Sequence, residues 1–404
     1  MRVAYLNPVS ALGGAERSLL DLIAALAVHD SAFEPHLVCG EEGPLTEAAR
    51  AQGVETTVLR LPPALGQLGD SALRSGGLRA ALRFAAGAPT AAWAAADYGA
   101  SLRDVLRRLR PDWIHSNALK THLLTPAFSD VAPVVWHLRD AIGQRRIAKR
   151  LLALAARKAR VGIGISSYVV RDARAALGRL PLVAVENAID LGTFSPQGSV
   201  AELDTLAGVP PLSSRSLRLG LVATYGRWKG QDVFLSALGE LARRAPQLSW
   251  RAYVIGGPIY RTAGSQWSLA ELREGAVRAG IGERVAFVPF QADPAPVFRA
   301  LDVVVHASTR PEPFGRTIAE AMACERALIV ARAGGAAELF SEGINALGVT
   351  PGEPSELAAA LGRLVGDKGL RERLGAQAGR HAASRFDRLR LGHEVGAVYA
   401  AYRP

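Results

Sequence analysis

The chain has 404 residues, of which 49% are hydrophobic and 21% are charged, so it is not a disordered protein and has room for two or three domains of about 150 residues each. The formal net charge is +11, but no zinc-finger or RNA-binding signature accompanies it, so nucleic acid is not an expected partner. Two cysteines, Cys39 and Cys324, are too few for a disulfide framework or a cysteine-based zinc site, and they fit a reducing compartment. The apolar runs are shorter than the roughly 20 residues that span a bilayer, and the first is too short for a signal peptide, so we expect a cytoplasmic chain.

Short apolar runs rich in Val, Ile and Leu alternate with segments of helical period along the chain. In the first half, this pattern predicts strands at 2–6, 36–39, 113–115, 134–137 and 161–165 and a helix at 15–27. Residues 62–110 are rich in Ala, Gly and Arg, and are predicted to form loop and helix without a strand. In the second half, it predicts strands at 217–224, 250–255, 285–288, 302–306 and 327–330, helices at 231–243 and 268–279, and only helix after Pro354.

Strands that alternate with helices indicate parallel sheets with right-handed crossovers. Two such series predict an α/β protein made of two Rossmann-like, doubly wound domains that face each other. Prolines, glycine and serines interrupt the periodicity between Asp190 and Ser216, which indicates the domain boundary. We therefore expect an N-terminal domain over 1–195 and a C-terminal domain over 196–385.

The most specific motif is the string from Pro311 to Met322, which places two glutamates around a loop-to-helix junction after a predicted strand. A helix that opens near Gly315 would point its free backbone N–H groups and its positive dipole end at a phosphate. Glu312, in the loop, would accept hydrogen bonds from vicinal hydroxyls, and Glu320 would face the same ligand. An isolated glutamate is more often a solvated surface charge, but the whole string is not explained in that way.

Three further strand ends carry candidate ligand-binding residues. Gly13 and Gly14 follow the first strand, where glycine lets backbone amides approach a phosphate, although a Gly-Gly pair is often an ordinary turn and no G-x-G-x-x-G is present. Arg227 and Lys229 lie in a strand-to-helix loop, where fixed cations would stabilise a departing diphosphate; the alternative is a solvated basic loop. His137 ends a strand, a position that is more often structural than catalytic.

No Asp-x-Asp, His-Glu-x-x-His or Gly-x-Ser-x-Gly motif is present, so we expect no metal site, no resident cofactor and no serine nucleophile. Seven basic residues and no acidic ones lie between 145 and 160, and Ile147, Leu151 and Leu154 form a helical stripe among them. Two interpretations stay open. One is a helix that rests on an anionic membrane surface through the cations Arg145, Arg146, Lys149 and Arg150. The other is a surface helix that packs this stripe on its own domain.

In their order and spacing, these motifs resemble those of glycosyltransferase family 4 over almost the full length of the chain. The matching pieces are Gly13-Gly14-Ala15-Glu16, Trp136-His137-Leu138-Arg139-Asp140, Glu186-Asn187-Ala188-Ile189-Asp190 with Phe194, Gly226-Arg227-Trp228-Lys229-Gly230-Gln231-Asp232, Glu312 to Glu320, and Gly334-Gly335 with Glu338. The resemblance implies a retaining enzyme with the GT-B fold, which is two Rossmann-like domains with a cleft between them. It also implies an acceptor-binding first domain, a second domain that holds a UDP or GDP type of sugar donor, and a helix over 386–404 that returns to the first domain.

The resemblance assigns roles to individual residues. Glu312 would hold sugar hydroxyls, Glu320 would hold the nucleotide ribose, and His137 would line the acceptor or donor-sugar site. Lys229 and Arg227 would stabilise the charge on the departing diphosphate. The start of the helix in the string (Phe314, Gly315, Arg316 and Thr317) would contact the donor, as would Gly13 and Gly14. One departure stands out, because the family usually has an arginine five residues before this lysine, and Thr224 occupies that position.

The expected function is sugar transfer to a saccharide or lipid-linked acceptor in cell-envelope or exopolysaccharide synthesis, without a metal ion. Arg139 and Asp140, which follow His137, would orient the acceptor hydroxyl, whereas His115, Asn117 and His306 are expected to be structural. The alternatives are a nucleotide-sugar epimerase on the same fold and a catalytically silent subunit, the latter suggested by Thr224.

Overall fold

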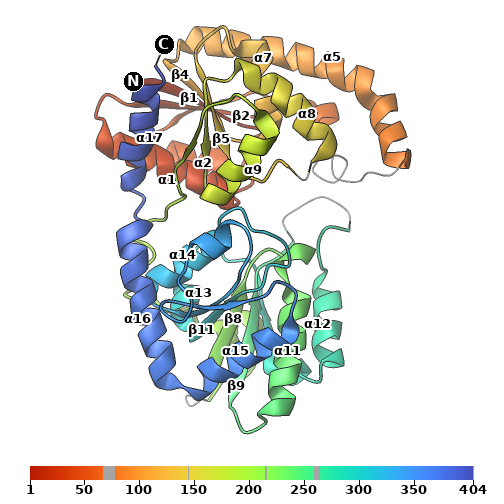
Figure 1. Cartoon of the computed structure of the whole chain (residues 1–404), viewed down its shortest axis with the longest axis vertical. Coiled ribbons are helices and arrows are strands. Elements are labelled where there is room, and N and C mark those ends of the chain that lie inside the picture. The colour runs from red at the N-terminus through yellow and green to blue at the C-terminus, as the bar shows by residue number, and fades with distance from the viewer. Residues whose placement is uncertain (67–77, 144, 214–215, 259–263, 404) are drawn as a thin grey trace. The chain divides into compact units, whose positions relative to one another are not determined.

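The computed structural model describes residues 1–66, 78–143, 145–213, 216–258 and 264–403, and for residues 66, 78–91, 146 and 147 it describes the backbone alone. The chain forms two compact units (Figure 1). Unit 1 comprises Met1–Ala188 and Arg388–Pro404, and unit 2 comprises Ile189–Asp387. Of the predicted loop and helix at 62–110, residues 67–77 lie outside the described residues.

Unit 1 is built on a seven-stranded parallel sheet in the order β3-β2-β1-β4-β5-β6-β7. Its strands are β1 (Arg2–Asn7), β2 (Glu34–Cys39), β3 (Glu55–Val58), β4 (Trp113–Ser116), β5 (Val134–Leu138), β6 (Val161–Gly164) and β7 (Leu182–Ala184). Its helices are α1 (Gly14–His29), α2 (Pro44–Ala51), α3 (Pro63–Gly66), α5 (Leu78–Leu109), α6 (Leu119–Leu123), α7 (Thr125–Phe128), α8 (Arg146–Ala155), α9 (Ser167–Leu177) and α17 (Arg390–Ala401), with a 3₁₀ turn at Ala156–Lys158.

Unit 2 repeats the plan with a six-stranded parallel sheet in the order β10-β9-β8-β11-β12-β13. Its strands are β8 (Leu217–Val222), β9 (Trp250–Ile255), β10 (Val285–Val288), β11 (Val303–His306), β12 (Ala327–Ala331) and β13 (Leu347–Val349). Its helices are α10 (Leu203–Ala207), α11 (Gln231–Arg244), α12 (Leu269–Arg278), α13 (Ala295–Ala300), α14 (Arg316–Ala323), α15 (Pro354–Gly366) and α16 (Lys368–Arg385), with 3₁₀ turns at Arg227–Lys229, Gly282–Arg284 and Gly335–Glu338.

The predicted α/β fold of two doubly wound parallel sheets is confirmed. The central strands β4, β5, β11 and β12 are buried along their whole length, because helices cover both faces of a parallel sheet. In unit 1 the strand order reverses between β1 and β4, and in unit 2 between β8 and β11. At such a reversal the loops after the two strands diverge, and ligands of open α/β sheets bind there.

All ten predicted strands are present, with ends within two residues of the expected ones, whereas β3, β7 and β13 were not predicted. These three are edge strands. An edge strand pairs on one side only and therefore tolerates polar or small residues, as in these three; the fourth edge strand, β10, is apolar throughout and was predicted. β3 and β7 are partly exposed, and β13 has Gly348 at its centre.

The first boundary lies after Ala188 rather than after residue 195, because residues 189–195 pack into unit 2. The N–H of Ile189 donates to the carbonyl oxygen of Phe386 at 2.8 Å, and the ring of Phe194 lies 6.2 Å from that of Phe298. The second boundary lies after Asp387, two residues beyond the expected position.

The segment after this boundary belongs to unit 1. α17 packs on α1, and the two lie side by side in Figure 1. Gly392 permits this approach, since a Cβ at this position would lie 2.5 Å from the carbonyl oxygen of Ala25. An ion pair of 3.6 Å between Arg388 and Asp21 lies beside the same contact. α17 also buries Val395 and Tyr399 in the core of unit 1.

Candidate functional site

Two charged side chains meet where the strand order of unit 2 reverses. Lys229 comes from the segment between β8 and α11, and Glu312 comes from the segment between β11 and α14. Nζ of Lys229 lies 2.9 Å from Oε2 and 3.0 Å from Oε1 of Glu312, so the ammonium group contacts both carboxylate oxygens. The two side chains are only 18% and 10% exposed. They form a largely desolvated ion pair at the sheet edge where ligands bind in this class of fold.

A glycine brings the Lys229 segment against the end of β11. Gly230 has a φ of 76°, and a Cβ there would lie 1.9 Å from the carbonyl oxygen of Ala307. The N–H of Thr309 donates to the carbonyl oxygen of Trp228 at 2.8 Å and joins the two segments. A larger residue at position 230 would separate the segments, so the Lys-Gly sequence is a geometric requirement of the ion pair.

A pair of glycines, Gly334 and Gly335, fixes the backbone of Glu312. The N–H of Gly335 donates to the carbonyl oxygen of Glu312 at 2.7 Å, and Gly334 forms a parallel bridge with Glu312. Gly334 has a φ of 66°, and a Cβ there would lie 2.5 Å from the same oxygen. The Gly334-Gly335 motif therefore supports the residue that carries the carboxylate.

The surroundings of Glu312 keep it ionised. Burial would raise the pKa of this carboxyl, but Lys229 and His306 outweigh burial and hold that pKa well below its usual range. Oγ of Ser308 donates to Oε2 at 2.9 Å, and Nε2 of His306 lies 3.4 Å from the same oxygen. Lys229 has three N–H donors and Glu312 has further lone pairs, so each can contact a ligand while the pair stays intact.

The helix after Glu312 opens with a glycine cap. Gly315 has a φ of 104°, and α14 begins at Arg316. The first N–H groups of a helix, here those of Arg316 and Thr317, lack partners within the helix and carry its positive end. The side chain of Phe314 is buried, with its ring edge-on to Phe386 at 5.9 Å, so any contact of Phe314 with a donor would be through its backbone.

Glu320 lies one turn into α14 and pairs with Arg316. Nε of Arg316 donates to Oε1 of Glu320 at 3.2 Å, and both side chains are mostly buried. The second glutamate of the motif is therefore a buried, paired carboxylate and not a solvated surface charge.

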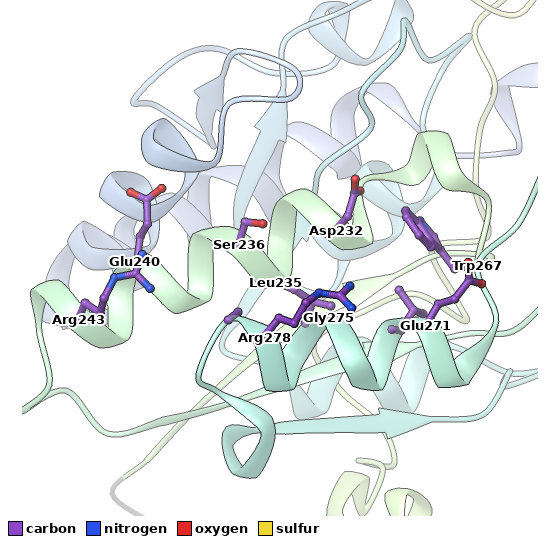
Figure 2. A pocket seen from close by; sticks show the side chains of 11 residues that line it. Asp232, Leu235, Ser236, Glu240, Arg243, Trp267, Glu271, Gly275 and Arg278 are labelled. Carbon is purple, nitrogen blue, oxygen red and sulfur yellow. The ribbon is translucent and has the colours of Figure 1, made fainter.

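Arg227 does not join the Lys229–Glu312 pair. Its guanidinium carbon lies 3.9 Å from the centre of the Trp267 ring, and Nη2 donates to Oε1 of Glu271 at 2.6 Å. The backbone N–H of Ser268 and this guanidinium hold the pKa of Glu271 at about 2. Figure 2 shows the cavity beside this group, of about 330 Å³, between α11 and α12. Trp267 and Glu271 line it, but neither Lys229 nor Glu312 does.

Thr224, at the position where the resemblance expects an arginine, follows β8. Its carbonyl oxygen accepts a bond from Nε2 of Gln231 at 2.7 Å. Within the described ranges, its buried Oγ1 has no hydrogen-bond partner. Of Lys229, Arg227 and Thr224, it is thus Lys229 that contacts the carboxylate of Glu312.

A polar network lies at the carboxyl ends of the unit 1 strands, with Arg139 at its centre. Nε of Arg139 donates to Oδ1 of Asn117 at 2.7 Å, and Nη1 donates to Oδ1 of Asn187 at 3.1 Å. Nη2 lies 3.4 Å from Nδ1 of His137. Nδ2 of Asn117 in turn donates to Oδ1 of Asn7 at 2.9 Å. The network therefore connects the ends of β1, β4 and β5.

The predicted phosphate position at the start of α1 already has a carboxylate. The N–H of Gly13 donates to Oε2 of Glu16 at 3.2 Å, and Nδ2 of Asn7 lies 3.5 Å from Oε1. Glu16 therefore caps the helix that begins at Gly14, and burial raises its pKa. A phosphate at Gly13 would share this position with Glu16 or displace it.

His137 is only 3% exposed and lies beside a second buried histidine. Nδ1 of His137 is 3.0 Å from Nε2 of His115. Burial, and then the charge of Arg139, hold the pKa of both histidines well below the usual range, so both rings are neutral at physiological pH.

Some members of these clusters were not predicted. Asn7 and Ser308 stand at or just after the carboxyl end of a predicted strand, and this position alone could have indicated that they belong to the site. Asn187 is part of a matching motif but carried no assigned role. Tyr399, whose hydroxyl contacts His115 at 2.7 Å, has no sequence signal, since 284 residues separate the two.

The predicted membrane contact through Arg145, Arg146, Lys149 and Arg150 is wrong for Arg145. Arg145 is only 1% exposed and pairs with Asp140 at 3.2 Å, so it is not available to a membrane surface. The side chains of Arg146 and Ile147 lie outside the description. Among those described, Lys149 is partly exposed and Arg150 is exposed.

Two of the three residues of the apolar stripe predicted for α8, Leu151 and Leu154, do not pack on unit 1. The helix packs through Ala148, Leu152 and Ala155, whereas Leu151 is 46% and Leu154 is 61% exposed. Among the described helices, none is long and apolar enough to cross a membrane. Similarly, no group of three or more His, Cys, Asp or Glu side chains suited to a metal ion occurs in the described ranges.

Family models match both units. Residues 12–193 match a model described as Glycosyltransferase Family 4, and residues 216–367 match one described as Glycosyl transferases group 1. A lipopolysaccharide core biosynthesis mannosyltransferase, LpcC of Rhizobium leguminosarum bv. viciae, is 30% identical over 224 residues, which are 54% of this chain and 60% of that protein. A D-inositol 3-phosphate glycosyltransferase of Nocardia farcinica is 36% identical over 168 residues, 40% of this chain and 36% of that protein. The chain thus spans less than two thirds of either relative.

Solved structures match over the whole chain. Alr3699/HepE of Anabaena, in complex with UDP-glucose, has a TM-score of 0.79 and 25% sequence identity, with 99% of this chain and 100% of that chain covered. WaaG, a glycosyltransferase involved in lipopolysaccharide biosynthesis, has a TM-score of 0.69 and 14% identity, with 98% and 99% covered. WaaG supports the fold alone.

Proposed function

Because the chain belongs to glycosyltransferase family 4 and has the GT-B fold, we propose that it transfers a sugar from a nucleotide-diphosphate sugar to an acceptor hydroxyl, with retention at the anomeric carbon. The observation that carries this proposal is the Lys229–Glu312 ion pair at the strand reversal of unit 2. One member has the charge that a diphosphate requires, and the other has the acceptor oxygens that sugar hydroxyls require.

In the proposed reaction, the bond between the anomeric carbon and the diphosphate breaks as the acceptor oxygen bonds to that carbon. Negative charge grows on the departing phosphate, and a fixed ammonium in a desolvated position stabilises that charge. Lys229 is this ammonium, and Glu312 accepts hydrogen bonds from the hydroxyls of the sugar. The opening N–H groups of α14 support the phosphates, and Glu320 holds the ribose.

The proposed donor is of the UDP or GDP type, and transfer needs no metal ion. The complex of Alr3699/HepE with UDP-glucose makes UDP-glucose the first donor to test. Metal independence rests on the positive groups of this chain, Lys229 and the start of α14, which together neutralise a diphosphate. Arg227 would contribute only if it left Glu271, so its role is secondary in this proposal.

The proposed acceptor is a saccharide or lipid-linked saccharide at the inner face of the cytoplasmic membrane. Two exposed leucines on α8, Leu151 and Leu154, stand beside the exposed cation Arg150. Apolar side chains next to cations on one helix favour a peripheral contact with anionic lipid. The similarity to a lipopolysaccharide core mannosyltransferase supports an envelope glycan as the product class.

The reaction is tested by nucleotide release. Purified protein is incubated with UDP- and GDP-sugars, with and without saccharide acceptors, and free nucleoside diphosphate is measured. Release that depends on the acceptor supports transfer. Conversion of the donor without an acceptor would instead indicate an epimerase, and no reaction with any donor and acceptor would indicate a silent subunit.

Variants connect this activity to the ion pair. Glu312→Gln keeps the shape of the side chain but removes its charge, and it should lower turnover strongly. Glu372→Gln is the matched control, because Glu372 forms an exposed pair with Lys368 on α16. If Glu312→Gln retained wild-type turnover, the assignment of this site would be wrong.

The membrane contact is tested by co-sedimentation with anionic and neutral vesicles at low and high salt. The double variant Leu151→Ser/Leu154→Ser should lose binding to anionic vesicles. Leu206→Ser, an exposed leucine of unit 2, is the control and should bind as the wild type does. Equal and negligible binding of the wild type to both kinds of vesicle would favour an acceptor free in solution.

A further inference from the structure

A chain of buried hydrogen bonds runs from helix α17 to His137. The hydroxyl of Tyr399 lies 2.7 Å from Nδ1 of His115, and Nε2 of His115 lies 3.0 Å from Nδ1 of His137. Nη2 of Arg139 approaches the same Nδ1 atom at 3.4 Å. The hydroxyl of Tyr5 lies 3.5 Å from that of Tyr399 and is the far end of the chain. All the side chains but Arg139 are buried.

The directions of the bonds in this chain follow from the chemistry of its two ends, a guanidinium group at one and a tyrosine hydroxyl at the other. A guanidinium group donates and never accepts, so Nδ1 of His137 must carry a lone pair toward Arg139. Because this nitrogen has no proton, the 3.0 Å contact with His115 requires Nε2 of His115 to be the donor. A neutral His115 with its proton on Nε2 has a lone pair on Nδ1, and that lone pair accepts the proton of the Tyr399 hydroxyl.

The remaining nitrogen of His137 is then a donor. A neutral imidazole with an unprotonated Nδ1 carries its proton on Nε2. Within the part of the chain that the structure describes, Nε2 of His137 has no hydrogen-bond partner. His137 stands at the carboxyl end of β5, the edge of the sheet at which ligands bind in open parallel folds.

We propose that Tyr399, acting through His115, is a positioning residue that holds His137 as a hydrogen-bond donor toward a substrate oxygen. This inference rests on the proposed function for the identity of the substrate, but not for the direction of the bonds. The ligand atom must accept a hydrogen bond, as a sugar hydroxyl oxygen or a phosphate oxygen does. His137 is thereby excluded as the base that removes the acceptor proton.

Burial supports the same assignment. It lowers the pKa of His115 and His137, and the positive charge of Arg139 lowers both further. Neither ring takes up a second proton near neutral pH, so the donor on Nε2 is present throughout that range. Among the described side chains, Arg139 is the one charged group that hydrogen-bonds to the His137 ring.

The direct test is NMR of the histidine ring nitrogens, which distinguishes the two neutral tautomers. We expect His137 to be protonated on Nε2 from pH 6 to pH 8, with its signals assigned by comparison with His137→Gln. Protonation on Nδ1 in the wild type would overturn the proposal. This measurement needs no substrate, so it stands even if no sugar transfer is found.

Variants test the role of Tyr399. Tyr399→Phe removes the hydroxyl that donates to Nδ1 of His115, so within the bond chain only the long 3.4 Å contact with Arg139 still favours an unprotonated Nδ1 on His137. His137 should then populate both tautomers, and kcat should fall about tenfold, the effect of one buried hydrogen bond. Tyr5→Phe is the matched control, because it removes a buried hydroxyl from the same cluster but not one that contacts His115. Tyr5→Phe should leave the tautomer of His137 unchanged and should keep kcat within about twofold of the wild type. A wild-type tautomer and wild-type kcat in Tyr399→Phe would refute the positioning role.

Substitution of His137 itself completes the test. The side-chain amide of glutamine places an N–H close to the position of Nε2, whereas that of asparagine places it close to Nδ1. His137→Gln should therefore retain more activity than His137→Asn. The reverse order would contradict a donor on Nε2. If both variants transferred sugar at the wild-type rate while the tautomer was as expected, the bond chain would stand and the role of His137 in the proposed function would be wrong.

Discussion

Removal of Lys229 gives the sharpest test of the ion pair. In Lys229→Met, the Glu312 carboxylate loses the ammonium that contacts both of its oxygens and keeps, among the described side chains, Ser308 and His306. Removing one partner of a buried ion pair costs roughly 3–5 kcal/mol. Because the pair is 18% and 10% exposed, we expect the lower end, about 3 kcal/mol, in the free energy of unfolding of unit 2.

For a domain of roughly 200 residues, such a loss lowers the melting temperature by about 6–12 °C. The assay is scanning calorimetry of the full chain, with Lys368→Met as the control. The double variant Lys229→Met/Glu312→Gln removes the charge as well as its partner, so most of the lost stability should return. Catalysis should not return, because both groups that are proposed to contact the ligand are missing.

The pH dependence adds a second criterion. In the wild type the pKa of Glu312 is depressed, so its stabilising effect is complete above the unfolded value of about 4.3 and is lost as the pH falls toward the folded value. In Lys229→Met, burial is no longer outweighed and the pKa of Glu312 rises. The stability gap between variant and wild type should therefore narrow from pH 7 to pH 5. A gap that stays constant, or a variant with wild-type stability at pH 7, would refute the reasoning.

Four other predictions follow from single features. Gly230→Ala should abolish turnover and lower the melting temperature, because its Cβ would collide with the carbonyl oxygen of Ala307; full activity would contradict the geometry. Glu320→Ala should raise the dissociation constant for UDP or GDP about 10- to 100-fold in calorimetry, the worth of a charge-assisted hydrogen bond, whereas an unchanged constant would remove Glu320 from the site. Activity should survive EDTA, and complete loss that magnesium or manganese restores would show a metal requirement. Arg145→Ala should lower the melting temperature of unit 1 without changing vesicle binding, since the side chain is buried; weaker vesicle binding in a variant of unchanged stability would contradict this.

The sequence predicted the buried elements better than the exposed ones. Strands 250–255 and 285–288 were predicted to the residue, because nearly all of their residues are apolar and buried. β3 and β7 escaped prediction because one side of an edge strand has no partner and tolerates polar residues. The helix at 268–279 was recognised within one residue at either end, and Ser268 and Glu271 form its capping box.

The candidate site was predictable where its proposed residues stand in one local motif. Glu312 and Gly315 lie in a single string, so their joint placement followed from a strand, a loop and a helix. Arg227 illustrates the limit, because its partner Glu271 lies 44 residues away and nothing in the local sequence predicts the pairing. Arg145 illustrates a second limit, because the sequence around a cation at the start of a helix does not show whether the tertiary fold buries it.

The membership of α17 in unit 1 has a consequence for the order in which the protein is made. Unit 2 is one continuous segment, whereas unit 1 needs residues synthesised before and after it. At about 5–20 residues per second, the ribosome takes roughly 10–40 s to add the approximately 200 residues of unit 2. During that interval, α17 has not yet been synthesised, so the face of α1 that it covers is exposed and His115 has no contact with Tyr399. The unit that is second along the chain is therefore the first that can complete its core, and a nascent chain stopped at Asp387 would carry a finished unit 2 behind an unfinished unit 1.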